Sequence, residues 1–263
     1  MRTVTRVLKY ELHNVARSRA VLAYAALLLV LTDVLFRFGG EGPRVVLSLV
    51  NVVLLFVPLV SIVFGTMYVY GAREFTELLL AQPVGRGELF SGLYLGLALP
   101  LAGAFLAGVG LPFVVHARPD AALWLPLAML LAGGVLLTFV FTAVAVFLAT
   151  LFDDRAKGLG GALLIWLGCA VLYDGIILLC VSLFRDYPLE RPVLVLTLLN
   201  PIDLGRVLML LQFDTAALMG YTGAVFEKFF GTSTGRTTVL AVLVVQAAVP
   251  LWLAGRVFRR KDF

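Results

Sequence analysis

Charged side chains are scarce in this chain of 263 residues: Asp, Glu, Lys and Arg make up 14% of it, where a soluble domain has about a quarter. Apolar residues make up 61%, and the mean hydropathy is +1.01. One soluble core cannot bury so much apolar surface, so lipid must be the solvent for much of it. Because the apolar segments recur from one end of the chain to the other, the composition predicts a single all-α integral membrane domain over residues 1–263.

Cysteine and histidine are rare too, with two of each. Cys169 and Cys180 lie inside one apolar segment, where a disulfide framework is implausible. They are about three helical turns apart, so they would share a helix face about 16 Å apart and could act as soft copper or sulfur ligands. Buried thiols more often behave as small hydrophobes, and the sequence assigns no metal site. It also lacks a G-x-x-x-x-G-K-[ST] phosphate-binding loop, so any ATP that drives the protein must bind to another chain.

Six apolar stretches are long enough to cross a bilayer, because a hydrocarbon core of about 30 Å takes about 20 helical residues. They cover residues 20–36, 46–70, 89–115, 121–151, 159–184 and 237–257. The fourth is too long for an upright span, so it must tilt or begin as an interfacial turn near Pro126. We therefore expect six membrane-spanning helices.

Lysine and arginine are unevenly distributed between the two sets of loops. Thirteen of the 21 lie in residues 1–19, the 71–88 loop, the 152–158 loop and the C-terminal tail, whereas the opposite short loops hold three. Basic residues favour the cytoplasmic side of a membrane. Both termini are therefore predicted to lie on the cytoplasmic side of the inner membrane. The net charge of +5 then reflects topology and not nucleic-acid binding.

Two segments are predicted to lie on the cytoplasmic membrane surface. Residues 1–19 read as an amphipathic surface helix whose apolar stripe comprises Val4, Val7, Leu8, Leu12 and Val15; an ordinary solvated leader is the alternative. The 71–88 loop has a charged helical start, an apolar Leu78–Leu80 patch and a stop at Pro83. We interpret it as a short helix across the membrane surface with its apolar face available to a partner.

The stretch 185–236 is far longer than a connecting turn and is predicted to lie outside the cell. Asn200 or Asp203 can cap a helix that runs to about Gln212, and Pro201 suits its first turn. Its apolar side chains are expected to pack on the outer ends of the spans and close the exit. These side chains are Leu204, Val207, Leu208 and Leu211.

Asp174 is the one acidic residue well inside a predicted span. An ionised carboxylate there costs about 2.5–3.5 kcal/mol on insertion scales, so it should face protein or a water-filled path. A role in the transport pathway is one interpretation. An interhelical hydrogen bond that fixes packing is the other, and we favour it. Asp33 lies four residues before Arg37 near the outer boundary, which predicts an interfacial ion pair.

Two strings resemble a known family. Residues 77–86 read ELLLAQPVGR, which resembles the "ELLL-x-x-P-V-x-R" signature in the coupling helix of type-2 ABC exporter permeases. Residues 199–206 read LNPIDLGR, which is similar to the LNP-x-D-x-x-R string in permeases of nitrous-oxide reductase maturation transporters. Tyr173-Asp174 in the fifth span also resembles those permeases. The order of spans, surface helices and basic tail is similar to this family along the whole chain.

The resemblance implies a transport subunit that is not itself an enzyme. It implies two copies of this chain and two ATPase subunits, which hold ATP and Mg²⁺, with no cofactor on this chain. ATPase coupling would involve residues of the 71–88 loop, namely Glu74, Glu77, Leu78, Leu79, Leu80, Pro83 and Arg86. The nitrous-oxide branch further implies a periplasmic accessory protein and a role in supplying the copper–sulfur cluster of the reductase.

Under this resemblance, Asn200, Pro201, Asp203 and Arg206 form an external gate or a partner contact. Asp203 and Arg206 are expected to lie at the contact with the periplasmic protein or to fix the helix that makes it. Two alternatives stay open. The chain could be the permease of a general drug, lipid or ion exporter, or a channel or intramembrane enzyme without ATP coupling. The second would need a pore-lining polar face or a catalytic pair, and neither is visible.

Overall fold

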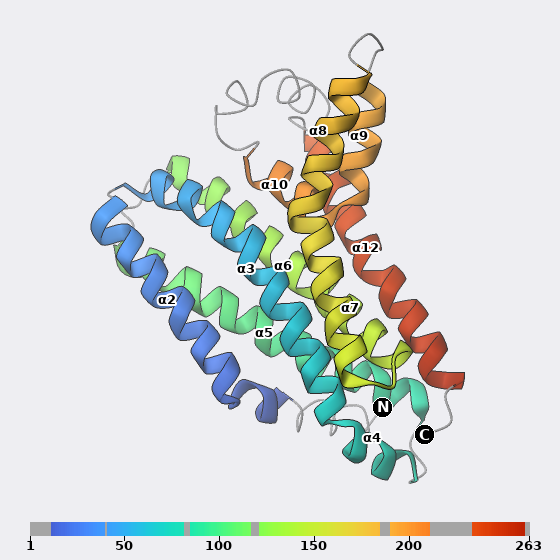
Figure 1. Cartoon of the computed structure of the whole chain (residues 1–263). Helices are drawn as coiled ribbons and strands as arrows, with labels where there is room; N and C mark the ends of the chain where they lie inside the picture. The colour runs from blue at the N-terminus through green and yellow to red at the C-terminus, as the bar shows by residue number, and fades with distance from the viewer. Residues whose placement is uncertain are drawn as a thin grey trace.

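The computed structural model describes residues 12–39, 41–81, 85–116, 121–184, 190–210 and 233–260. The regular structure within these ranges is entirely helical (Figure 1). The elements are α2 (Arg19–Gly39), α3 (Gly42–Gly71), α4 (Arg73–Leu80), α5 (Arg86–His116), α6 (Ala121–Leu151), α7 (Arg155–Leu167), the π-helical turn η1 (Gly168–Leu172), α8 (Tyr173–Leu183), α9 (Glu190–Leu199), α10 (Pro201–Leu210) and α12 (Ser233–Arg260).

The six predicted spans are confirmed as helices of membrane-spanning length and composition. They are α2, α3, α5, α6, the continuous run α7–η1–α8, and α12. We call Arg155–Leu183 the fifth span. The long fourth stretch is helical through Pro126, so an interfacial turn is not what accommodates its length. Prolines are tolerated inside such helices because neighbouring groups satisfy the freed backbone carbonyls.

The core lies between α3, α5 and α6. More than half of the most apolar part of each of these helices is buried, whereas none of the fifth span's corresponding part is. Phe105, Phe141 and Leu137 are among the largest fully buried side chains. Glycine lets the helices approach closely: a methyl group added at Gly108 would lie 2.8 Å from the backbone oxygen of Ala25 on α2.

Three buried threonine hydroxyls in the bundle are satisfied within their own helices. Thr32, Thr66 and Thr138 each donate to the carbonyl four residues earlier, at 2.6–2.8 Å. Inside a membrane no water is available to such groups, so an internal acceptor removes the cost of burying them.

Within the stretch predicted to be external, the described helix α10 packs on α3 and α6. The helices α9 and α10 meet at an angle of 107° and together are apolar enough to enter a membrane. A methyl group added at Gly205 on α10 would lie 3.1 Å from Leu137 and 3.2 Å from Leu54. Those leucines lie near the middle of α6 and α3, so α10 packs at mid-span and not on the outer ends.

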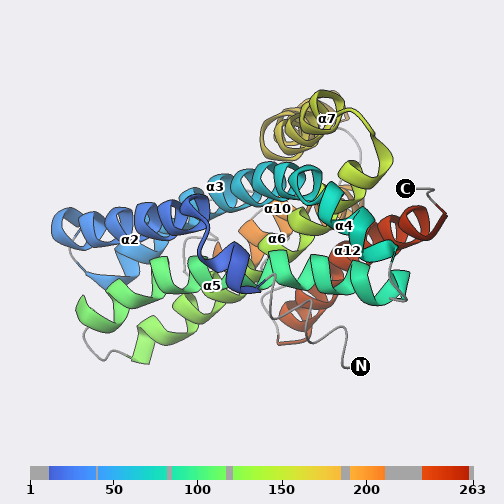
Figure 2. The same ribbon diagram turned by 90° about the horizontal axis from the view of Figure 1, so that it is seen from below.

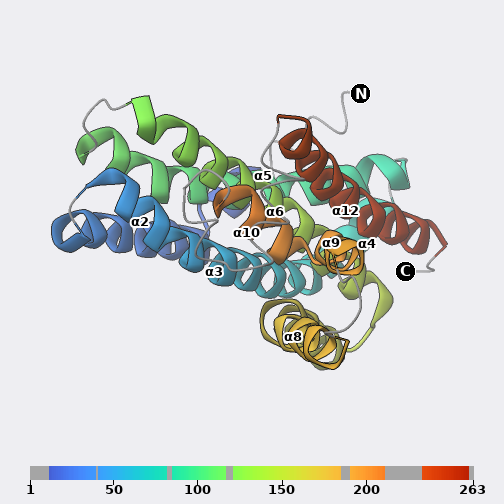
Figure 3. The same cartoon turned by 90° about the horizontal axis from the view of Figure 1, so that it is seen from above.

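The described helices on either side of α10 reach the same end of the molecule. In Figure 1, α9 lies beside α8 and leads down to α10, and α12 then begins at the end opposite α4. Viewed from above, α10 lies over the middle of the bundle beside α3 and α6 (Figure 3). The sharp bend is that of a broken span or a re-entrant loop, and we call α9–α10 the re-entrant pair. The described part of the predicted apolar stripe is confirmed as buried, since Leu204, Val207 and Leu208 are at most 6% exposed.

The predicted surface helix of residues 1–19 lies mostly outside the described residues. Residues 12–16 are helical, and Val15 is fully buried in the core.

The Asp33–Arg37 ion pair is confirmed with an N–O distance of 2.8 Å, and His116 lies 3.4 Å from the same carboxylate.

Candidate functional site

The loop between α3 and α5 contains the short helix α4, as predicted. It begins directly after α3 and is strongly amphipathic. Thr76 is its buried residue, and its hydroxyl donates to the carbonyl of Ala72. Glu74, Glu77 and Leu78 are exposed, with Leu78 69% accessible. This face presents two carboxylates beside one uncovered leucine.

The predicted apolar patch is only partly exposed. Leu79 and Leu80 are half-buried and pack against the core. Of the three predicted leucines Leu78 is thus the fully exposed one, and a contact of Leu79 and Leu80 with the ATPase stays a prediction. Arg86 begins α5, is exposed, and donates to the carbonyl of Arg259 at 2.9 Å. Pro83 lies outside the described residues.

The start of α4 is linked to the turn that leads into the fifth span. The Tyr70 hydroxyl donates to the carbonyl of Phe152 at 2.8 Å and to that of Asp154 at 3.2 Å. Arg73 pairs with the Asp153 carboxylate at 3.1 Å and with Glu77 at 3.3 Å. Asp154 caps α7 by accepting from the Ala156 backbone nitrogen. The end of α3, the start of α4 and the start of the fifth span thus form one connected unit.

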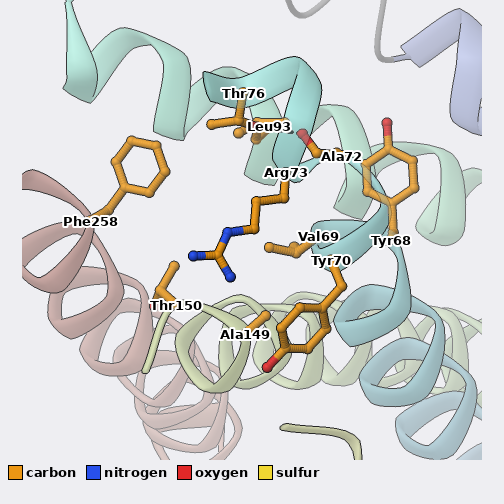
Figure 4. Close-up of a pocket in the computed structure, with 10 residues that line it drawn as sticks. All are labelled: Tyr68, Val69, Tyr70, Ala72, Arg73, Thr76, Leu93, Ala149, Thr150 and Phe258. Carbon is orange, nitrogen blue, oxygen red and sulfur yellow. Dashed lines mark hydrogen bonds between the residues drawn. The ribbon is translucent and has the colours of Figure 1, made fainter. Parts of the chain in front are cut away.

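A small cavity of about 40 Å³ lies at this junction. Figure 4 shows the Arg73 side chain extended across it, with Val69, Leu93 and Thr150 around it. The lining residues come from α3, α4, α5, α6 and α12. Voids of this kind are few in well-packed proteins, so the junction is less tightly packed than the core beside it.

A second group of polar residues lies where α10 meets the fifth span. Arg206 pairs with Asp174 at 2.9 Å and with Asp203 at 3.2 Å. Asn200 donates to Asp203 at 3.0 Å and to the carbonyl of Cys169 at 2.8 Å. One guanidinium between two carboxylates explains how acidic groups are tolerated at this depth. We call Asp174, Asn200, Asp203 and Arg206 the α10 cluster.

The predicted start of α10 is confirmed. Pro201 is its first residue, and the Asn200 side-chain oxygen accepts from the Ile202 backbone nitrogen at 3.1 Å. Asn200 thus uses its amide oxygen and both amide protons. Aspartate at this position could not donate to Cys169 or Asp203, which is the physical reason for an amide here.

The predicted contact of Asp203 with an external protein does not fit its position. Asp203 is 6% exposed and Asn200 is 1% exposed, because both are enclosed between α10 and the fifth span. The alternative prediction, that these residues fix the helix, agrees with their bonds. Asp174 is likewise used in interhelical packing, which is the interpretation that we favoured for it.

The two cysteines do not share a regular helix face. The π-helical turn η1 contains Cys169 and precedes Cys180, so the α-helical spacing between them is interrupted. Both thiols are free and half-buried. The described residues contain no group of three or more His, Cys, Asp and Glu side chains arranged to hold a metal ion.

Four further polar contacts were not anticipated from the sequence. Tyr173 donates to the carbonyl of Leu196 at 2.6 Å, Gln246 to that of Leu198 at 2.8 Å, and Trp166 to that of Leu55 at 3.2 Å. The Arg73–Asp153 pair is the fourth. Gln246 could have been found, since a lone amide inside an apolar span needs an internal partner. The acceptors of Tyr173, Gln246 and Trp166 are backbone carbonyls, which no sequence pattern identifies.

Six spans, a short amphipathic helix between the second and third, and a re-entrant pair before the last define a polytopic transport subunit. Residues 5–263 match the profile described as ABC-2 family transporter protein, and the chain belongs to this family. It is 29% identical over 277 aligned positions to the probable ABC transporter permease protein NosY of Pseudomonas aeruginosa, covering 99% of each chain. It is 27% identical over 270 positions to that of Stutzerimonas stutzeri, covering 96% of this chain and 92% of the relative.

Proposed function

We propose that this ABC transporter permease subunit serves nitrous-oxide reductase maturation. It moves a sulfur- or copper-related species with energy from ATP hydrolysed on a separate subunit. The observation that carries this assignment is the similarity to two NosY permeases along nearly the whole chain. The LNPIDLGR string of residues 199–206 supports it further, because it builds the start of α10 and most of the α10 cluster.

The ATPase binds at α4, which offers Glu74, Glu77 and Leu78 on an exposed face. ATP and Mg²⁺ belong to that partner, and this chain holds no cofactor of its own. Leu78 inserts into an apolar groove while the two carboxylates fix orientation, a division of roles common at protein interfaces.

The permease is a homodimer in the inner membrane with both termini in the cytoplasm. Figure 1 places the start of α2, the helix α4, the start of α7 and the end of α12 at one end of the bundle. Several basic residues lie at that end, including Arg19, Arg73, Arg155 and Arg260. Basic residues are enriched on the cytoplasmic side of membrane proteins, which supports this orientation. A second copy covers the uncovered apolar surface of the fifth span, and a periplasmic accessory protein docks at the opposite end.

The decisive experiment co-expresses the chain with a candidate ABC ATPase subunit and with nitrous-oxide reductase. Wild-type permease is expected to bind the ATPase and to restore the copper–sulfur cluster in cells that lack the permease. Leu78→Asp should insert normally yet lose ATPase binding and cluster assembly, because a charge in an apolar groove is unfavourable by several kcal/mol.

Val115→Asp is the matched control, since Val115 is 75% exposed at the opposite end of the bundle. It should bind the ATPase as wild type does. If cells without the permease still produce a fully loaded reductase, the nitrous-oxide assignment is wrong, and a general exporter permease becomes the better assignment. If Leu78→Asp and wild type recover equal ATPase, α4 is not the docking helix.

A further inference from the structure

The fifth span is held by few contacts for its length. None of the residues in its most apolar part is buried, and Leu178 and Leu179 on α8 are both more than half exposed. From below, α7 lies outside the row formed by α2 and α3 (Figure 2), and α8 stands apart from the bundle when viewed from above (Figure 3). No residue of α8 is buried, so polar contacts hold that half of the span, whereas α7 also buries Gly158 and Ala162 against the bundle.

These contacts lie at two levels. At the α4 end, Tyr70 holds the turn before α7 through two hydrogen bonds, and Arg73 adds its ion pair with Asp153. The ring of Tyr70 also packs on Gly158, where a larger side chain would have no room. Of these links the Tyr70 hydroxyl matters more, because the Asp153 side chain is 73% exposed and exposed ion pairs contribute little.

At mid-span, the contacts join the fifth span to α10. Asn200 and Arg206 bind Cys169 and Asp174, respectively. The turn η1 lies at this mid-span level, since it contains Cys169 and ends just before Asp174; in it the Tyr173 backbone nitrogen donates five residues back to Gly168. Such π-turns release backbone carbonyls from the regular ladder and bend helices. The released region is where Asn200 bonds to the Cys169 carbonyl.

We infer that the fifth span is a lever that couples the position of α4 to the closure of α10. Displacement of α4 together with the adjoining end of α3 pulls the start of α7 through Arg73 on α4 and Tyr70 on α3, and the small cavity around Arg73 gives the junction room to shift. The span bends at η1, which separates Asp174 from Arg206 and releases α10 from mid-membrane. In the proposed transporter the ATPase supplies the displacement, but the coupling itself lies within this chain.

Both native cysteines lie on this lever, so one of them can report on it directly. A thiol reacts with maleimide as the thiolate, and it does so where water reaches it. With Cys180→Ser, Cys169 is the sole thiol beside the α10 cluster. Its labelling rate in the purified permease, without ATPase or nucleotide, measures how often α10 opens.

Arg206→Gln breaks the cluster directly and should raise the labelling rate at Cys169 about fivefold or more, within the range of ordinary allosteric couplings. Tyr70→Phe keeps the ring and removes the hydroxyl. It should also raise the labelling rate at Cys169, although Tyr70 contacts the opposite end of α7. Arg73→Gln should act likewise but more weakly. Exchanging the charges, with Arg73→Asp and Asp153→Arg, should return the rate toward wild type.

Lys157→Gln is the matched control, because it removes a positive charge from an exposed site near the same turn without touching α4. It should label as wild type. Equal labelling of Tyr70→Phe and wild type, with Arg206→Gln raised, would refute the lever, and so would an unchanged rate in Arg206→Gln. Because this assay needs no ATPase, its failure leaves the α4 docking assignment standing. The outcome of the ATPase-binding experiment with Leu78→Asp, in turn, does not test the lever.

Discussion

The Arg206 ion pairs offer a direct test of how the re-entrant helix is held. The perturbation is Arg206→Gln, which removes charge-assisted bonds to Asp174 and Asp203 while keeping much of the side chain. Such bonds are worth about 1.5–3 kcal/mol each when buried. The Arg206 side chain is 31% exposed and that of Asp174 is 39% exposed, so solvent screening lowers the sum. We expect a loss of about 2–3 kcal/mol in the free energy of unfolding, most of it from leaving Asp203 without its cation.

The chain contains its own control. Arg37 pairs with Asp33 at 2.8 Å, nearly the same distance, but its side chain is 68% exposed. Arg37→Gln should therefore cost less than about 1 kcal/mol. The two variants should differ by about thirtyfold in the ratio of folded to unfolded protein, at 1.4 kcal/mol for each factor of ten.

The assay is equilibrium unfolding of the detergent-solubilised permease by a denaturing detergent, followed by circular dichroism. A second variant checks the cause: adding Asp203→Asn to Arg206→Gln should recover part of the loss, because a neutral amide needs no cation. Equal destabilisation by Arg206→Gln and Arg37→Gln would show that the α10 cluster is not energetically special. Failure of Asp203→Asn to recover stability would show that the buried carboxylate is not the source of the loss.

Three further outcomes are expected. Leu79→Asp should lower the yield of folded permease in size-exclusion chromatography, because Leu79 packs on the core; equal yield with wild type would contradict this. Gly205→Leu should destabilise the permease by about 1–3 kcal/mol in the same unfolding assay, because added atoms would meet Leu54; an unchanged midpoint would refute the close packing of α10. In a cysteine-free background, an impermeant thiol reagent added to whole cells should label Phe38→Cys but not Glu77→Cys, and the reverse result would overturn the orientation.

The spans could be predicted from the sequence because their signal is long and local. A stretch of about 20 apolar residues is a helix in a membrane whatever it packs against, since every backbone group must be satisfied within it. The short helix α4 was also predictable from its charged start and its following Pro83 and Gly85. What could not be predicted was which leucines of α4 face inward. That depends on how α3 ends, and Ala72 joins the two helices with no intervening loop.

The contacts of the fifth span could not be predicted from the sequence for a different reason. Tyr70, Trp166 and Tyr173 donate to backbone carbonyls in other elements, and any residue type offers such an acceptor. The π-helical turn likewise has no clear signature in the string GCAVL. The sequence thus identifies the elements, whereas the polar contacts between them arise from the three-dimensional arrangement.

The position of α10 could nevertheless have been predicted from one pair of charged residues, Asp174 and Arg206. Placing all of 185–236 outside the cell rested on its length, and length alone does not distinguish an external domain from a re-entrant one. Asp174 carried the missing information, because a carboxylate left unpaired at that depth would cost about 2.5–3.5 kcal/mol. Few basic residues remained that the loop count had not placed on one side of the membrane. Arg206 was one of them, and it follows the helix start formed by Asn200 and Pro201. Pairing Arg206 with Asp174 brings the start of α10 to the middle of the fifth span, where the 2.9 Å contact places it. In a chain with so few charges, the partner required by a buried charge is a stronger constraint on topology than the length of a polar segment.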